Sequence, residues 1–250
     1  MRKTCLALLS ALSLFLPTTQ SSKAFLLEEL TLFVNRPSTT IRLEKDSSFT
    51  VPTDTEKGFG ISYSVENFPV IPDVRAEYTH LHTTGSKRLK EDLTIADYTV
   101  AKGTKVGTKL DGNNINLTLY YQPLDRLNYD FLNLELGINL FFIDYKVKTS
   151  FNYSGNTTKT EDDLSTVIPS FHVKISCSPT YYLNLFLRGA IPFSDRRENK
   201  EIEGGVKYFL NSQLYLFGSY AYGLSKADDV DGYDLKATSR VFSLGVGFIW

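Results

Sequence analysis

The chain has 250 residues, of which 42% are apolar and 22% charged, so it is not disordered and its length fits one large domain or two small ones. The net charge of −1 gives no basic field of the kind that attracts nucleic acid. The composition favours β structure, because 15 Tyr and 17 Phe stand against one Met and one Trp.

The first residues have the pattern of an export leader. Arg2 and Lys3 form a basic start, and residues 5–16 form an apolar run of 12 residues, too short to span a bilayer as a helix. Ser22-Lys23-Ala24 then fits a small-x-small cleavage site. We therefore predict a signal peptide at 1–24.

The remaining residues, 25–250, show no boundary of a second domain. Cys177 is the only cysteine in this part, which excludes an internal disulfide and a zinc site built from cysteines. No apolar run there reaches 18 residues, so we expect no transmembrane helix.

Most of this part alternates between apolar and polar residues with period two, which indicates strands with one apolar face. The pattern predicts ten strands, at 26–34, 58–66, 72–82, 113–122, 131–148, 165–177, 180–190, 201–210, 213–224 and 239–250. The first is the weakest, because Glu28 and Glu29 interrupt its alternation.

The connections between these strands alternate between long and short along the whole chain. The short ones carry turn residues, in Glu66-Asn67-Phe68-Pro69, Gln122-Pro123-Leu124-Asp125, Ser178-Pro179 and Asn211-Ser212. The long ones are polar and charged, and the longest spans roughly 83–112. Short turns at one end and long loops at the other are typical of an outer-membrane barrel.

The polar faces of the predicted strands carry charges of both signs. If these faces line a lumen, it holds four cations and three carboxylates, from Arg75, Glu77, Glu135, Lys174, Arg188, Glu203 and Lys207. Such groups would pair and close the lumen, because an unpaired buried charge is costly. On a soluble sheet the same residues would lie on the wet face.

The last strand ends in an alternating aromatic pattern. Its apolar face would carry Phe242, Leu244, Val246, Phe248 and Trp250. This ending resembles the C-terminal signal that bacterial outer-membrane barrels present to the barrel-assembly machinery, although that signal usually ends in Phe.

Other stretches resemble small, poorly characterised outer-membrane barrels of Gram-negative bacteria, of the OmpA-like and OmpW-like kind. They are Glu66-Asn67-Phe68-Pro69 with Pro72-Asp73-Val74-Arg75-Ala76-Glu77-Tyr78, then Leu117-Thr118-Leu119-Tyr120-Tyr121-Gln122-Pro123-Leu124-Asp125, and Gly204-Gly205-Val206-Lys207-Tyr208. The resemblance covers most of residues 58–250. It implies a fold and a location, but no activity and no catalytic residues.

Groups that could carry chemistry are few. His172 shares a strand face with Ser170, an arrangement that acyl transfer can use, but a hydrogen-bonded lumen histidine explains it more simply. His80 and His82 lie near an external rim, with Asp97 in the following loop. Acidic residues around Gly232 have a density that suits calcium but lack an EF-hand spacing; they are Asp228, Asp229, Asp231 and Asp234. We expect no enzyme activity, no cofactor and no metal.

These patterns predict an all-β, transmembrane, antiparallel up-and-down barrel of about ten strands, or eight if 26–34 and a neighbour do not span. We expect Sec export to the bacterial outer membrane and a structural or surface-interaction role through long external loops. The alternatives are a narrow pore, a barrel enzyme acting on lipid or peptide, and a soluble exported ligand-binding barrel.

The expected partners follow from that location. They are outer-membrane lipid and lipopolysaccharide, with phosphate contacts from basic loop segments such as 87–90 and 196–197, and the barrel-assembly machinery during insertion. We expect no nucleic-acid partner, and the sequence leaves the external ligand open.

Overall fold

The computed structural model describes residues 26–44, 48–52, 57–66, 68, 71–90, 92–95, 98–124, 131–153, 156–193, 197–230 and 233–250. The predicted leader at 1–24 lies outside these residues. Among the described residues, no helix is long and apolar enough to cross a membrane.

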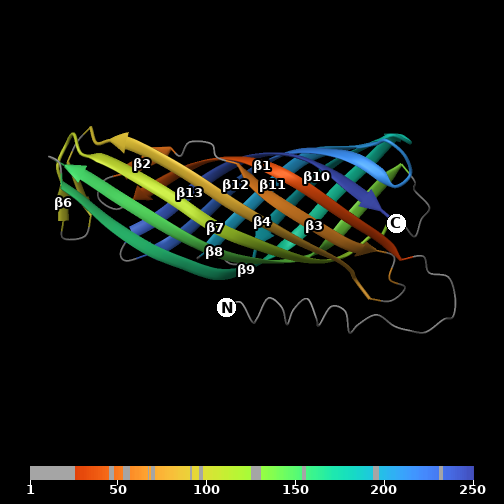
Figure 1. The fold of residues 1–250 in the computed structure, drawn as a ribbon. Helices are drawn as coiled ribbons and strands as arrows, with labels where there is room; N and C mark the ends of the chain where they lie inside the picture. Colours follow the sequence, from red (N-terminus) through yellow and green to blue (C-terminus); the bar gives the residue numbers. More distant parts are fainter. Residues whose placement is uncertain are drawn as a thin grey trace, which may run out of the picture.

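Ten long strands form one closed antiparallel barrel (Figure 1). They are β1 (Leu27–Glu44), β3 (Gly58–Glu66), β4 (Asp73–Arg88), β7 (Lys105–Tyr121), β8 (Leu132–Tyr153), β9 (Asn156–Thr180), β10 (Leu183–Pro192), β11 (Arg197–Phe209), β12 (Leu214–Val230) and β13 (Tyr233–Ile249). Each pairs with its neighbours in the chain, and β13 pairs with β1 from Glu29↔Ile249 to Glu44↔Asp234. The predicted all-β up-and-down barrel with ten strands is confirmed, and the eight-strand alternative is wrong.

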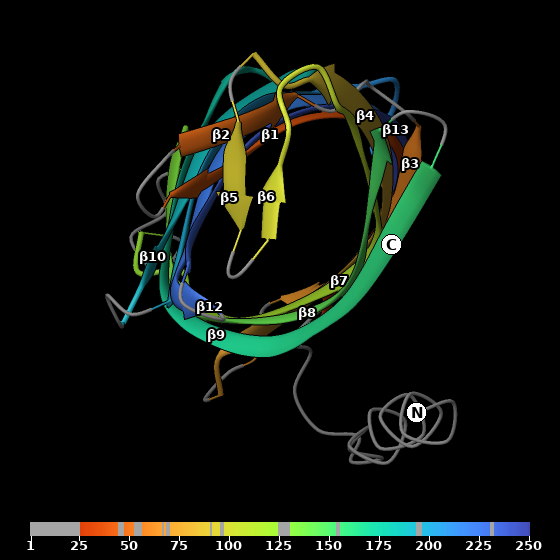
Figure 2. The ribbon, with the colours of Figure 1, turned by 90° about the vertical axis from the view of Figure 1, so that its left-hand side faces the viewer.

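Among the described residues, three short strands lie outside this ring of ten. β2 (Ser48–Pro52) pairs with the far end of β1. β5 (Leu93–Ile95) and β6 (Tyr98–Val100) form a hairpin within the connection between β4 and β7. Figure 2 shows this hairpin lying across part of the barrel mouth, at the end with the long connections.

The strands are longer than the alternation predicts, and almost all of the extra length lies at that same end. β1 continues to Glu44 where the pattern predicts an end at 34, and β9 begins at Asn156 where it predicts 165. Beyond these points the outward side chains are no longer apolar. Residues 156–163 of β9 are all polar, and a strand with polar residues on both faces shows no period-two signal. On β1 the alternation stops after 34 and returns only at Ile41 and Leu43, a stretch too short to predict a strand.

The apolar face of the barrel points outward. Leucine, isoleucine, valine, phenylalanine and tyrosine side chains are exposed around the ring, among them Leu32, Phe59, Ile115, Ile138, Phe171, Leu187, Ile202, Leu216 and Leu244. A soluble barrel needs this face inside. The soluble alternative therefore does not fit the structure, whereas a barrel surrounded by lipid does.

Aromatic side chains mark both edges of this apolar belt. Exposed rings at the end that holds the C-terminus are Tyr121, Phe131, Tyr181, Tyr182, Tyr208 and Trp250, and those near the opposite edge include Phe59, Phe142, Tyr222 and Phe242. Two aromatic rims are typical of barrels that meet two membrane–water interfaces.

Closure of the ring depends on a tight contact between β13 and β1. Gly245 pairs with Phe33, and a Cβ atom at Gly245 would clash with the backbone oxygen of Leu32 and the Cβ of Phe33. Gly218 on β12 has space, because its nearest neighbours would be side-chain carbons of Leu244 and Val206 at 3.5 and 3.8 Å.

We predict that Gly245→Val prevents the β1–β13 ladder from closing, whereas Gly218→Ala is tolerated. The measurement is the fraction of protein that migrates as a compact, unboiled species on a detergent gel after refolding. Equal fractions for both variants would show that the contact at Gly245 does not limit closure.

Candidate functional site: the charged lumen and the strand extensions

All seven charged residues predicted to line a lumen do face the interior of the barrel. Pairing places Glu135, Lys174, Arg188 and Glu203 side by side on β8, β9, β10 and β11. Residues an even number of positions apart on a strand point to the same face, so Lys207 shares the inward face of Glu203 on β11. Arg75 and Glu77 likewise share the inward face of β4. The sequence therefore located these groups but not their partners.

Glu135 is the centre of the first cluster. Arg75 donates two hydrogen bonds to its carboxylate, at 2.9 and 3.1 Å, and Lys174 donates a third at 2.5 Å. His172 Nε2 lies 3.2 Å from the same carboxylate. Glu66, 3.7 Å from Arg75, adds a second carboxylate. This cluster therefore balances two cations with two anions.

Arg188 is the centre of the second cluster. Its guanidinium donates to both carboxylate oxygens of Glu77, at 3.0 and 3.3 Å, and its Nε contacts Glu203. Glu201 lies 3.8 Å away. Three carboxylates therefore surround one cation.

Lys207 forms the third cluster with a residue that the sequence analysis treated as an interruption. Its Nζ lies 2.6 and 2.7 Å from the two carboxylate oxygens of Glu29, which also accepts a hydrogen bond from Tyr215 at 2.6 Å. The break in alternation at Glu29 was the signal in the sequence, because a charged residue on the lumen face of a strand needs an oppositely charged partner in the lumen.

Large side chains complete the filling of the lumen. Tyr120 and Tyr215 are fully buried, and Tyr120 donates to Glu66 at 2.7 Å while Arg75 lies over its ring. The predicted lumen set lacks both tyrosines, although period two places Tyr120 on the same face as Thr118.

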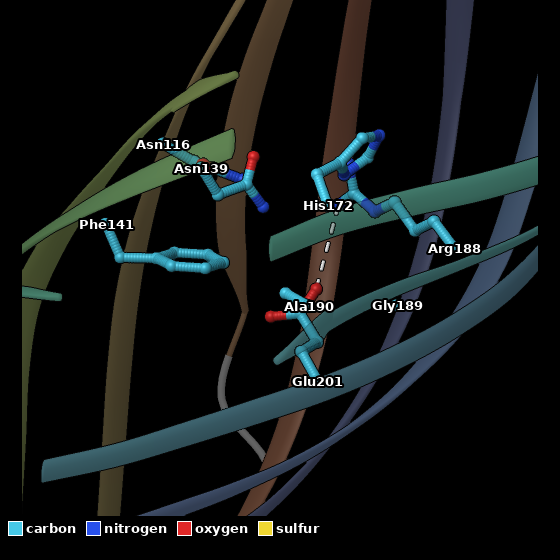
Figure 3. Close-up of a pocket in the computed structure, with 8 residues that line it drawn as sticks. All are labelled: Asn116, Asn139, Phe141, His172, Arg188, Gly189, Ala190 and Glu201. Carbon is cyan, nitrogen blue, oxygen red and sulfur yellow. Dashed lines mark ion pairs between the residues drawn. The ribbon is translucent and has the colours of Figure 1, made fainter. Parts of the chain in front are cut away.

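A small polar hollow remains beside the second cluster (Figure 3). Strands β7 to β11 line it with Asn116, Asn139, Phe141, His172, Arg188, Gly189, Ala190 and Glu201. Phe141 and Ala190 also belong to a small apolar cluster with Ile168, so the hollow lies where the charged lumen meets an apolar patch.

The candidate catalytic groups are not brought together. His172 directs Nε2 to Glu135, while the Ser170 hydroxyl is buried without a hydrogen-bond partner. His82 pairs with Asp111 at 2.8 Å on the outward face, and Asp97 lies outside the described residues. Asp231 and Gly232 of the acidic loop lie outside them as well. Within the described ranges, no group of three or more His, Cys, Asp or Glu is placed to hold a metal ion.

Beyond the apolar belt, the outward face becomes charged while the strand pairing continues. On β8 the outward residues change from Phe142 to Asp144, Lys146 and Lys148. Lys148 lies 2.9 Å from Glu161 on β9, and this hydrogen bond lowers the pKa of the Glu161 carboxyl. The extension is therefore an ordered, water-facing hairpin.

The remaining predicted site residues lie on the outer surface. Phe242, Leu244, Phe248 and Trp250 are exposed on the outward face, and Val246 is half-buried between them. Among the basic loop residues, Arg88 donates to the Gly103 carbonyl at 3.4 Å and Lys90 is exposed; Arg196 is outside the described residues.

Comparison with known proteins gives only distant likenesses. No family model and no curated protein matches the chain. The translocator domain of autotransporter NalP from Neisseria meningitidis is 12% identical, covering 99% of this chain and 95% of that one at a TM-score of 0.43. The attachment invasion locus protein Ail of Yersinia pestis is also 12% identical, with coverage of 89% and 98% and a TM-score of 0.36. Neisserial surface protein A is 11% identical, with coverage of 87% and 96% and a TM-score of 0.32. Because these scores are low, the proposals below rest on the geometry of this chain.

We predict that Glu135→Gln destabilises the barrel by about 3–5 kcal/mol, because it leaves Arg75 and Lys174 buried without their shared anion. The measurement is the unfolding midpoint in detergent micelles with increasing urea. Glu161→Gln is the matched control. It removes a carboxylate that takes part in an exposed ion pair with Lys148, so it should leave the midpoint unchanged. Equal effects of the two variants would contradict the central place of Glu135.

Proposed function

We propose that this chain is a bacterial outer-membrane barrel with a structural or surface-contact role, whose lumen is closed and whose extended strand ends carry the contacts. The observation that carries the proposal is the change of the outward face from apolar to charged at one level around the ring. The strand ladders continue beyond that level.

The apolar belt supports insertion into a bilayer. A tilted transmembrane strand needs about 9–11 residues, and all the barrel strands reach that range or exceed it, from the 9 residues of β3 upward. The outward apolar side chains on paired strands end together, as in the row Tyr78, Ile115, Phe142 and Val167. A surface that is apolar up to a common level fits a lipid layer rather than water.

The length of the strand extensions supports a role outside the membrane. β8 continues from Phe142 to Tyr153, which amounts to roughly 35 Å of strand at about 3.3 Å per residue. Its pairing with β9 holds to Tyr153↔Asn156. A paired hairpin of this length is a rigid support for residues that contact the surroundings, such as lipopolysaccharide or another cell surface.

The filled lumen argues against an open pore. Three ion-pair clusters and two buried tyrosines occupy the interior within the belt. Ten strands also lie well below the 16–18 that leave an aqueous channel in porins. The narrow pore therefore stays the second candidate, favoured only by the hollow beside Arg188.

The last strand supports a role in assembly. β13 presents Phe242, Leu244, Phe248 and Trp250 outward and forms the closing ladder with β1. A partner that recognises this strand before closure would meet an unpaired edge with an apolar face. This fits recognition by the barrel-assembly machinery.

We predict that an epitope inserted between Tyr153 and Asn156 is labelled by antibody on intact cells. An epitope between Tyr181 and Tyr182 should be labelled only after the envelope is permeabilised, because that turn lies at the opposite end of the barrel. Recovery of the folded protein in the outer-membrane fraction is the control. Labelling of both sites on intact cells, or recovery in the soluble fraction, would refute the membrane topology.

We predict that the wild-type barrel gives no stepwise conductance in planar lipid bilayers. Arg188→Ala should give small, cation-selective steps, because it removes the cation that holds Glu77, Glu201 and Glu203 together. Lys109→Ala, on the outward face, is the control and should stay silent. Regular steps from the wild-type protein would favour the narrow pore instead.

A further inference from the structure

The three lumen clusters differ in their balance of charge. Arg75 and Lys174 meet Glu135 and Glu66, and Lys207 meets Glu29, so these clusters pair equal numbers of cations and anions. Arg188 alone meets three carboxylates, Glu77, Glu201 and Glu203. With all three carboxylates ionised, the second cluster carries two negative charges in excess.

Buried excess charge needs a counter-charge, because a carboxylate removed from water without one is strongly destabilised. Glu203 is 5% exposed and touches the Arg188 Nε, and Glu77 accepts both guanidinium hydrogen bonds. Glu201 has the longest contact, 3.8 Å, and borders the hollow. Glu201 is therefore the carboxylate of this cluster that lies farthest from the Arg188 guanidinium, and it lines the hollow.

A second, independent feature of the hollow is an acceptor atom without a donor. Asn116 is 9% exposed and lines the hollow, and its Oδ1 atom is buried without a hydrogen-bond partner. Its neighbour on β4 is Glu77, which belongs to the same cluster. A buried acceptor of this kind calls for a donor, a water molecule or a cation.

We propose that the hollow binds an alkali-metal cation, held by the Glu201 carboxylate and the Asn116 amide oxygen. Carboxylate and amide oxygens are the ligands that hard cations prefer. The positive Arg188 guanidinium beside the hollow favours one charge over two. Figure 3 shows Glu201 joined to Arg188, with Asn116 and Asn139 contributed by the neighbouring wall. The site depends only on the lumen and is independent of any surface role.

The first test measures thermal unfolding of the refolded barrel in detergent micelles, followed by loss of the compact gel species. Sodium, potassium or rubidium chloride is compared with N-methyl-D-glucamine chloride at equal ionic strength. The small cations should raise the wild-type midpoint by about 2–4 °C, because a ligand of the folded state stabilises it by mass action. Glu201→Gln should abolish this difference, and Glu161→Gln, far outside the lumen, should retain it.

Two results would overturn the proposal. One is a wild-type midpoint that is the same in all four salts but rises on acidification, with no such rise in Glu201→Gln. That result would assign the counter-charge to a proton on Glu201. The other is the same cation dependence in both variants, which would place the ion elsewhere.

A second measurement decides the question if Glu201→Gln does not refold. Crystals of the wild-type barrel grown in rubidium chloride should show an anomalous-scattering peak in contact with the Glu201 carboxylate and Asn116 Oδ1. Absence of a peak in the hollow would refute the site, whatever the unfolding data show.

Discussion

The ladder between β13 and β1 is the constraint on which the rest of the structure depends. Without it the ten strands would form an open sheet with two unpaired edges and no interior. With it, each strand has one face inside and one outside, and period two sends every second residue to each. The close approach at Gly245 and Phe33 shows how little space this ladder leaves.

Closure inverts the usual distribution of polarity. The apolar side chains lie outside, so the interior is stabilised by ion pairs and hydrogen bonds rather than by an apolar core. Glu135 illustrates the consequence, because its single carboxylate satisfies Arg75 and Lys174 and also contacts His172. In such an interior each charge is stabilised by its oppositely charged partners. Where these are unequal in number, as around Arg188, a further counter-charge is needed.

The same geometry separates two functions of the strands. Within the belt they present apolar side chains outside and paired charges inside. Beyond it they become an extension with charged outward side chains and salt bridges such as Lys148–Glu161. The connection between β4 and β7 adds the β5–β6 hairpin across the mouth (Figure 2). A closed barrel with an ordered rim can hold the residues that make surface contacts in fixed positions.

The sequence by itself predicted about ten spanning strands in up-and-down order and placed seven charged residues on their polar faces. Alternation with period two is a local property, and so it put Arg75, Glu135 and Arg188 on the face opposite the apolar one; closure of the ring made that face the interior. It failed at the start of β9, where residues 156–163 are all polar and give no period-two signal, and at the end of β1, where only the short alternation of Ile41 and Leu43 with Arg42 and Glu44 marks the strand.

Only the tertiary structure decided which charges meet. Arg75 and Glu135 are 60 residues apart, Arg188 and Glu77 are 111, and Lys207 and Glu29 are 178. These pairs depend on the register of the ladders and on the closure of the ring, which place distant strands across one narrow lumen. Glu29, read from the sequence as an interruption, became a lumen anion for that reason.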